Sequence, residues 1–445
     1  MAKVSVLIPV CNVEKYLEQC LDSVTGQSME DIEIICVDDG STDGSGAVLD
    51  RYAVTDRRIQ VIHKKNTGYG NTMNVALDHA EGEYIAIIES DDFAEPDMLQ
   101  RLYRAAADHD AEVVKSNHYI YQNGKDWLCD WLKDYPKNRI INASVCPQIL
   151  NLADTIWTCL MRRDFLVEHN IRFHETPGAS FQDISFALQV WMNVERAYFI
   201  SDAVLHYRKD NPGSSMHNPD KIFCVFEEYG WLEEIFSGVW EHKPEIEKYF
   251  VATKYRDYFS HYGRVAVQYQ YALLLRLSES LEADVRSGRV VERAFSGPVW
   301  EQICSVQKDR NGFFRKTAKD MQDMRVKFCE FDNMKLYGRA FAEYMKMFPQ
   351  VVVYGAGKVG QKLAAALKKY EVANICFAVT KMSPEMAEWE GIPVCELQET
   401  AGLAETCAII IAVAERSQYE LYQNLLQYNF RHVFRVDEAV WKIME

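Results

Sequence analysis

The sequence predicts an α/β fold in which a mainly parallel, doubly wound sheet carries the functional residues. Short apolar, β-branched runs alternate with helical segments along residues 4–88, and their connections are short, a pattern typical of βαβ units. The run at residues 84–88 contains no charge, as expected for a strand covered on both faces. Polar residues follow these runs, and the ends of parallel strands form the edge where α/β sheets bind ligands.

Four strands are expected in the first part of the chain, at residues 4–10, 32–37, 59–63 and 84–88, with helices between them. Their ends would place polar residues along one rim, at Pro9–Asn12, Asp38–Asp39 and Glu89–Asp91. The pattern becomes helical after about residue 220, and a new strand begins near residue 351. We therefore predict an α/β domain at residues 1–219, a mostly helical region at 220–348 and a small Rossmann-like α/β module at 349–445.

The composition fits a well-packed globular protein and argues against several other classes. Hydrophobic residues make up 48% of the 445 residues and aromatic residues 12%, which argues against disorder. The formal net charge of −16 argues against a nucleic-acid partner. No apolar run approaches the roughly 20 residues that span a bilayer, and the N-terminus lacks the features of a signal peptide. The 12 cysteines form no CxxC pair, so we expect reduced thiols in a cytoplasmic protein.

Three carboxylates crowd the end of the fourth predicted strand, at Glu89, Asp91 and Asp92. Clustered acids repel one another, and a hard divalent cation with oxygen ligands would relieve that repulsion. The alternative is an Asp-rich turn that leads into the helix near Asp97. The segment by itself is compatible with both explanations.

Four blocks of sequence, in this order and spacing, resemble the family 2 glycosyltransferases of the GT-A fold. The blocks are VSVLIPV with Asn12, DDGSTD from Asp38, NTG from Asn66 with Asn74, and ESDD from Glu89. The resemblance covers about residues 1–220 and identifies the first predicted domain as a GT-A domain. It implies a nucleotide-diphospho-sugar donor, a divalent metal ion and inversion at the sugar carbon.

The resemblance also implies roles for residues of the donor site. Asp39 would bind the nucleotide base, and Asp91 would hold Mn²⁺ or Mg²⁺ bridging the two phosphates. Glu89 stands where the family usually has the first Asp of its D-x-D motif, so the resemblance implies metal binding less firmly for it. An alternative for Asp39 is a turn cap over Ser41. The other residues assigned to the donor site are Pro9, Val10, Asn12, Glu14, Asn66, Gly68, Asn74, Ser90, Arg208 and Ser214.

Asp183 is the candidate catalytic base, because an inverting transferase must deprotonate the acceptor hydroxyl. An apolar helical pattern begins at this point, so Asp183 is expected near a helix N-terminus, and a plain helix-cap aspartate is the alternative. The resemblance supports the base, although Gln182 replaces the first residue of the family's usual acidic pair. Arg208 and the Ser-rich loop with Ser214 would contact phosphate oxygens.

The sequence is compatible with more than one role for several histidine and aromatic residues. Trp157 either lines the pocket or packs in the core, and His206 or His217 could complete the metal shell. Aromatic residues recur in the helical region, where core packing is the first explanation and a platform for an acceptor sugar or a partner surface is the second. These residues are Tyr255, Tyr258, Phe259, Tyr262, Tyr269 and Tyr271.

The C-terminal module opens with a glycine-rich fingerprint. A strand at residues 351–354 is followed by Gly355, Gly357 and Gly360 in the spacing G-x-G-x-x-G, and then by a helix. The acidic residue expected at the end of the next strand is missing, since Thr380 stands there. The module is also short for a full dinucleotide fold, so a degenerate scaffold, an unidentified small ligand or a dimer contact is favoured over NAD.

The expected function is metal-dependent, inverting transfer of a sugar from a nucleotide-diphospho-sugar, with UDP-sugar favoured, to a hydroxyl of a surface glycan or lipid-linked acceptor. Peripheral association with the inner face of the plasma membrane and a homodimer are left open. One alternative is a non-catalytic sugar-nucleotide sensor or scaffold, since Glu89 and Gln182 depart from the family pattern. Another is an NAD(P)-binding enzyme that acts through the C-terminal module.

Overall fold

The computed structural model describes residues 2–152, 155–211, 223–265, 267–317, 341–382 and 387–436. The chain divides into two compact units, residues 1–257 and residues 258–445, and each is described by itself. The division into three domains stays a prediction. In the described ranges, no helix is both long enough and apolar enough to cross a membrane.

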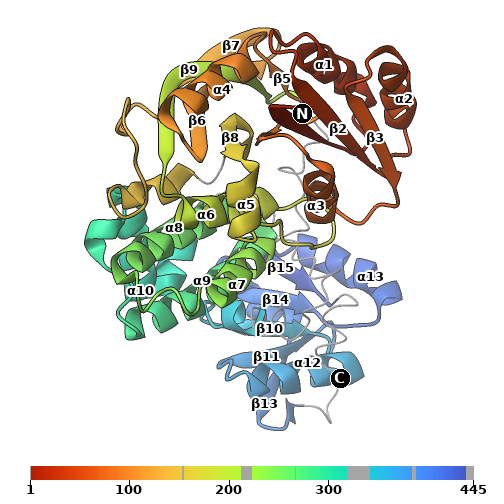
Figure 1. Cartoon of the computed structure of the whole chain (residues 1–445). Helices are drawn as coiled ribbons and strands as arrows, with labels where there is room; N and C mark the ends of the chain where they lie inside the picture. Colours follow the sequence, from red (N-terminus) through yellow and green to blue (C-terminus); the bar gives the residue numbers. More distant parts are fainter. Residues whose placement is uncertain are drawn as a thin grey trace. The chain divides into compact units, whose positions relative to one another are not determined.

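One half of the first unit's sheet has the predicted parallel strands (Figure 1). β1 (Val4–Val10) lies between β2 (Ile32–Asp39) and β4 (Tyr84–Ile87), and β3 (Ile59–Lys64) pairs with β2. All three pairings are parallel. β1 and β4 are buried throughout, which explains why their sequences carry no charge. The predicted strands and their order along the chain are therefore confirmed.

The other half of this sheet is mixed, a feature that was not predicted. The strand order continues from β4 through β8, β6 and β9 to β5, and β7 pairs with β6. Only the β6–β9 pairing is parallel in this half. The strands are β5 (Phe93–Ala94), β6 (Val113–Gln122), β7 (Lys125–Cys129), β8 (Cys159–Arg162) and β9 (Ala197–Arg208). The short β5 pairs with the end of β9 and so brings Arg208 beside the acids after β4.

Helices flank this sheet (Figure 1). α1 buries Leu17, Cys20, Leu21 and Val24, whose spacing places them on one face of the helix. The helices and turns are α1 (Glu14–Thr25), α2 (Ser45–Thr55), α3 (Tyr69–His79), α4 (Met98–His109), η1 (Pro147–Leu152), η2 (Ile156–Thr158), α5 (Arg163–Glu168), α6 (Gln182–Asn193), α7 (Cys224–Ile235) and α8 (Pro244–Tyr262).

The aromatic residues of the helical region form core. Tyr255, Tyr258, Phe259, Tyr262 and Tyr271 are each at most 4% exposed. The core-packing prediction is therefore confirmed for these residues, and the alternative of an exposed sugar platform or partner surface is wrong for them. The second unit continues with α9 (Val267–Arg286), η4 (Glu292–Ala294) and α10 (Gly297–Thr317).

The second unit also holds a six-stranded sheet in the order β12-β13-β11-β10-β14-β15. All its pairings are parallel except that of β12 with β13. The five parallel strands therefore have the Rossmann-type order 3-2-1-4-5. The elements are β10 (Val351–Tyr354), α12 (Lys358–Lys369), β11 (Ile375–Val379), β12 (Glu388–Trp389), β13 (Ile392–Glu396), η6 (Leu397–Leu403), β14 (Ala408–Ile411), α13 (Glu415–Leu426) and β15 (His432–Arg435).

Two glycines of the fingerprint are required by geometry. Gly355 has a φ of 115°, which disfavours a side chain. A Cβ at Gly360 would lie 1.8 Å from the carbonyl oxygen of Gly355, so only glycine permits this close approach of α12 to β10. Gly357 has open space around it. The predicted strand, glycine turn and helix are therefore present.

Candidate active site

The acids predicted as metal ligands and base share one neighbourhood at the end of β4. Burial, together with the charges of Asp91 and Asp183, raises the pKa of Glu89 to about 8. Asp183 lies in the first turn of α6, as predicted. The fold thus brings a residue of α6 close to acids that precede it by some ninety positions, close enough for their charges to interact.

Two tyrosines that the sequence analysis did not select flank these acids. The hydroxyl of Tyr69, at the start of α3, donates a 2.6 Å hydrogen bond to Oε1 of Glu89. Tyr207, on β9, has a raised pKa because it is buried and because Asp91, Asp183 and the other acids lie near it. Either tyrosine could have been selected from the sequence only because it adjoins a predicted site residue: Tyr69 follows Gly68, and Tyr207 precedes Arg208.

Asp91 and its neighbours have the chemistry of a site for a divalent cation. Oδ2 of Asp91 accepts a 2.7 Å hydrogen bond from Asn211. Asp92 is 1% exposed, and its Oδ2 has no hydrogen-bond partner among the residues that the structure describes; burial and the charge of Asp91 raise its pKa well above the usual range. A buried acid with one unpaired oxygen, next to the partly exposed Asp91, fits a nearby cation. No three His, Cys, Asp or Glu side chains in the described ranges could hold a metal ion together, so substrate oxygens would have to complete the shell.

Both nitrogens of His206 are engaged elsewhere. Nδ1 lies 2.6 Å from Asp126 and Nε2 lies 2.8 Å from Glu95. These contacts argue against His206 as a metal ligand. His217 and Ser214 lie outside the described residues.

Arg208 is buried and links β9 to the acidic turn. Its backbone N–H donates to Asp92 (2.8 Å), and its Nε donates to the carbonyl oxygen of Asp91 (2.8 Å). The guanidinium lies 4.8 Å from the ring centroids of Tyr16 and Tyr121, and the residue as a whole is 7% exposed. The arginine therefore holds the turn that presents Asp91, and its predicted contact with phosphate stays a prediction.

Asp39 organises the loop before α3. Its carboxylate accepts hydrogen bonds from the backbone amides of Thr67 (2.8 Å) and Gly68 (3.0 Å) and forms an ion pair with Lys64. The turn cap over Ser41 is made instead by Asp38, whose Oδ1 accepts from the Ser41 amide at 2.9 Å. The alternative explanation of Asp39 as that cap is therefore wrong.

Asn12 and Glu14 hold the loop between β2 and α2. Oδ1 of Asn12 accepts from the amide of Thr42 (2.8 Å), and Oε2 of Glu14 accepts from the amide of Gly44 (2.9 Å). Both residues line a surface hollow of about 540 Å³. The remaining predicted residues nearby are Pro9, Val10 and Ser90, which are buried, and Asn66, which is exposed and contacts Cys11.

A strap at residues 173–180 crosses the start of α3 and leads into α6. Gly68 has a φ of 97°, and a Cβ there would lie 2.6 Å from the carbonyl oxygen of Thr176. Asn74 both donates to Phe173 (3.0 Å) and accepts from it (2.9 Å), so its side chain fixes the strap. Gln182 donates through Nε2 to Thr176 Oγ1 at 2.7 Å. An ionised acid could not make this donation, which gives a physical reason for the departure from the family's acidic pair.

The contacts of Trp157 favour packing. It is 6% exposed, and its ring stacks on that of Tyr207 with centroids 5.1 Å apart. Trp157 is still close to the acids, because Tyr207, on which it stacks, lies near them.

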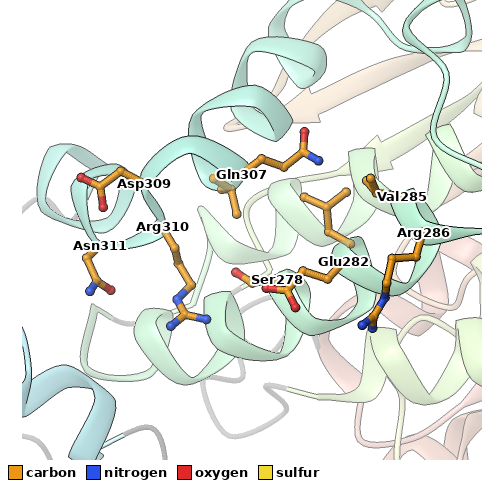
Figure 2. Close-up of a pocket in the computed structure, with 10 residues that line it drawn as sticks. Ser278, Glu282, Val285, Arg286, Gln307, Asp309, Arg310 and Asn311 are labelled. Carbon is orange, nitrogen blue, oxygen red and sulfur yellow. The ribbon is translucent and has the colours of Figure 1, made fainter. Parts of the chain in front are cut away.

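The second unit has a hollow of about 520 Å³ between α9 and α10 (Figure 2). Glu282 and Arg286 of α9 and Asp309 and Arg310 of α10 are among its lining, which therefore mixes both signs of charge. None of the predicted site residues lines it. At the end of β11, the Thr380 hydroxyl lies 2.8 Å from the hydroxyl of Tyr354.

Comparisons with known proteins agree with this geometry. The family model described as Glycosyl transferase family 2 matches residues 5–168. GlyG, a glycosyltransferase of Streptococcus pneumoniae, is 30% identical over 219 residues, which are 46% of this chain and 70% of GlyG. EpsJ, an uncharacterised glycosyltransferase of Bacillus subtilis, is 31% identical over 224 residues, which are 49% of this chain and 64% of EpsJ.

A crystal structure of TarS residues 1–349 from S. aureus, in complex with UDP-GlcNAc, has a similar fold. The TM-score is 0.55 at 21% sequence identity, and the match covers 71% of this chain and 90% of that one. At this identity the likeness bears on the fold alone. It agrees with the predicted GT-A architecture.

Proposed function

Because the chain belongs to glycosyltransferase family 2, we propose that it transfers a sugar from a nucleotide-diphospho-sugar to a hydroxyl of a glycan or lipid-linked acceptor. The observation that supports the proposal is that Asp183 and Asp91 lie near enough to Glu89, at the end of β4, for their charges to raise its pKa. A UDP-sugar is the favoured donor, since the similarly folded TarS was crystallised with UDP-GlcNAc.

Asp183 is the proposed base. Its carboxylate takes the proton from the acceptor hydroxyl while that oxygen forms a bond to the anomeric carbon. The bond from this carbon to the diphosphate breaks on the opposite face, and the configuration inverts. Asp183 is suited to this role because the strap before α6 is fixed by Gln182 and Asn74.

Asp91, with Glu89 as its partner, would hold Mn²⁺ or Mg²⁺. The ion, when bound, would neutralise negative charge on the diphosphate as it leaves. The chain's own residues orient this site: Asn211 holds the Asp91 carboxylate, and Arg208 holds the turn that carries it.

The nucleotide is proposed to lie over the ends of β1 and β2. Asn12 and Glu14 order one loop there, and Asp39 orders another. Loops fixed in this way lower the cost of ordering a pocket when the donor binds. The assignment of Asp39 to the base rests on the family resemblance.

The decisive test is nucleotide release from UDP-Glc, UDP-GlcNAc, UDP-Gal and GDP-Man in Mn²⁺, with and without a saccharide acceptor. Asp183→Asn should lower the rate by about 10²-fold or more. The control is Asp164→Asn, because the Asp164 side chain is 86% exposed on α5 and should not affect the rate. Full turnover by Asp183→Asn would remove this residue as the base.

A non-catalytic sugar-nucleotide sensor is the second candidate, and the bond between Tyr69 and Glu89 favours it, since that bond occupies the atypical acid. Calorimetry separates the two functions. Metal-dependent donor binding without release of nucleotide from any donor would select the sensor.

A further inference from the structure

A row of four aromatic side chains leads from the protein surface to the acids. Trp131 meets the edge of His118, with centroids 5.8 Å apart, and His118 meets Trp157 at 4.7 Å. Trp157 stacks on Tyr207 at 5.1 Å, with an angle of 13° between the rings. These four residues are called the aromatic row below.

The two ends of the aromatic row are accessible and its middle is not. Trp131 is 41% exposed, and Tyr207 is partly exposed. His118 and Trp157 are 3% and 6% exposed, so they support the ends rather than touch a ligand. Burial also lowers the pKa of His118 to about 4, so the row is uncharged at neutral pH.

Tyr207 provides a hydroxyl group at the inner end of the row. This hydroxyl forms no hydrogen bond with any other residue that the structure describes. Trp157 stacks on one face of the Tyr207 ring, and Nζ of Lys209 lies 4.5 Å from the centroid of the same ring. A ligand would therefore contact the hydroxyl of Tyr207 rather than a face of its ring. The interaction of Tyr207 with Asp91 and Asp183 places it beside the proposed reaction centre.

The strand order puts the aromatic row on the opposite side of β4 from the strands that carry the proposed nucleotide site. β1 and β2, which carry the proposed nucleotide site, lie on one side of β4, whereas β6 and β9 lie on the other. Figure 1 shows β6, β7 and β9 together in that second half. An acceptor must approach the reacting carbon from the face opposite to the leaving diphosphate, so its binding residues need not be those that hold the nucleotide; His118 and Tyr207 belong to β6 and β9.

We propose that the aromatic row is the binding site of a saccharide acceptor at least two sugar units long. The Tyr207 hydroxyl holds a hydroxyl of the reacting unit beside Asp183, and the exposed ring of Trp131 packs against the C–H face of a later unit. Rings of this kind combine apolar area with a polar edge, as sugar recognition requires. The inference rests on the proposed glycosyltransferase function and adds the class and location of its acceptor.

The first experiment needs no donor. Saturation-transfer NMR on the full chain uses maltotriose, cellotriose, chitotriose and octyl β-D-glucoside as probes. We expect at least one probe to receive saturation from the wild-type protein and to lose most of it in Trp131→Ala. Trp127→Ala is the control, since Trp127 is 50% exposed on the adjoining β7 but does not belong to the row. No transfer to any probe, or equal transfer in Trp131→Ala and the wild type, overturns the proposal.

The second experiment uses a probe that accepts sugar and compares transfer with donor hydrolysis in the same preparation. Trp131→Ala should raise the acceptor KM about five- to tenfold, and Tyr207→Phe should lower the ratio of transfer to hydrolysis about tenfold. An unchanged acceptor KM and ratio would overturn the proposal. Failure of the proposed function would look different, because no nucleotide would be released from any donor while saccharide binding could still be read by NMR.

Discussion

The hydroxyl of Tyr69 donates a 2.6 Å hydrogen bond to Oε1 of Glu89, and this bond joins α3 to the acidic turn after β4. It gives a reason for the glutamate at a position where the family usually has aspartate, because the longer side chain reaches the phenol. The bond opposes the effect of burial on the partly exposed Glu89, because a donated hydrogen bond stabilises the charged carboxylate and lowers a pKa that burial raises to about 8.

Tyr69→Phe and Glu89→Asp should each lower kcat/KM for the donor about tenfold, and the double variant should lose little more than either one. Both changes remove the same bond, so their effects are not additive. The measurement is nucleotide release at saturating metal. Tyr52→Phe is a matched control, since Tyr52 makes an equally short bond of 2.6 Å to Asp22 at the surface. Fully additive effects would show that Tyr69 and Glu89 act separately.

Gln182→Glu should weaken the protein although it restores the family's acidic pair. The change replaces the Nε2 donor with an acceptor that faces Thr176 Oγ1 and the carbonyl oxygen of Gly178. We expect a loss of roughly 1–3 kcal/mol in the free energy of unfolding and a lower rate of nucleotide release, since the strap also positions Asp183. Thermal unfolding measures the first effect, with the exposed Gln100→Glu as control. An unchanged or more active Gln182→Glu enzyme would contradict the positioning role.

Local sequence patterns were sufficient for the half of the first sheet that is built from βαβ units. The runs of β1 and β4 are apolar because both faces are covered, and their polar ends mark the rim. The position of Asp183 at the start of a helix was likewise predicted from the apolar pattern beside it, whereas its role as the candidate base rests on the family resemblance.

The remainder depends on contacts between residues far apart in the chain. The antiparallel pairing of β4 with β8 joins Tyr84 to Arg162, and no local pattern specifies that partner. The same holds for Arg208, whose partners Gln19 and Asp91 are contributed by α1 and the acidic turn. Composition alone could not decide whether Tyr255 was core or surface, since aromatic residues serve both.

Gly360→Ala should disrupt the C-terminal sheet, and Gly357→Ala should not. The new Cβ at Gly360 would lie 1.8 Å from the Gly355 carbonyl oxygen, whereas the one at Gly357 would meet nothing within 4 Å. We expect a loss of about 3 kcal/mol or more for the first variant and about 1 kcal/mol or less for the second. Hydrogen exchange of the β10 and β14 amides measures the stability of the C-terminal sheet separately from the rest of the chain. Equal exchange rates in the two variants would show that the close approach is not required.

Glu228→Gln should gain stability relative to the wild type as the pH rises. Glu228 is 2% exposed, and burial raises its pKa from 4.5 to about 7. Between these values the folded protein holds a proton that the unfolded chain has lost, so the stability from this group is complete below pH 4.5 and is lost as the pH rises through 7. Glutamine carries no such dependence. From pH 5 to pH 8 the difference in free energy of unfolding should shift by about 2–3 kcal/mol in favour of the variant.

Thermal unfolding at several pH values measures this difference, with the exposed Glu227→Gln as the control on the same helix. A difference that stays constant with pH would mean that Glu228 is ionised throughout, with the neighbouring His174, 3.0 Å away, as its counter-charge.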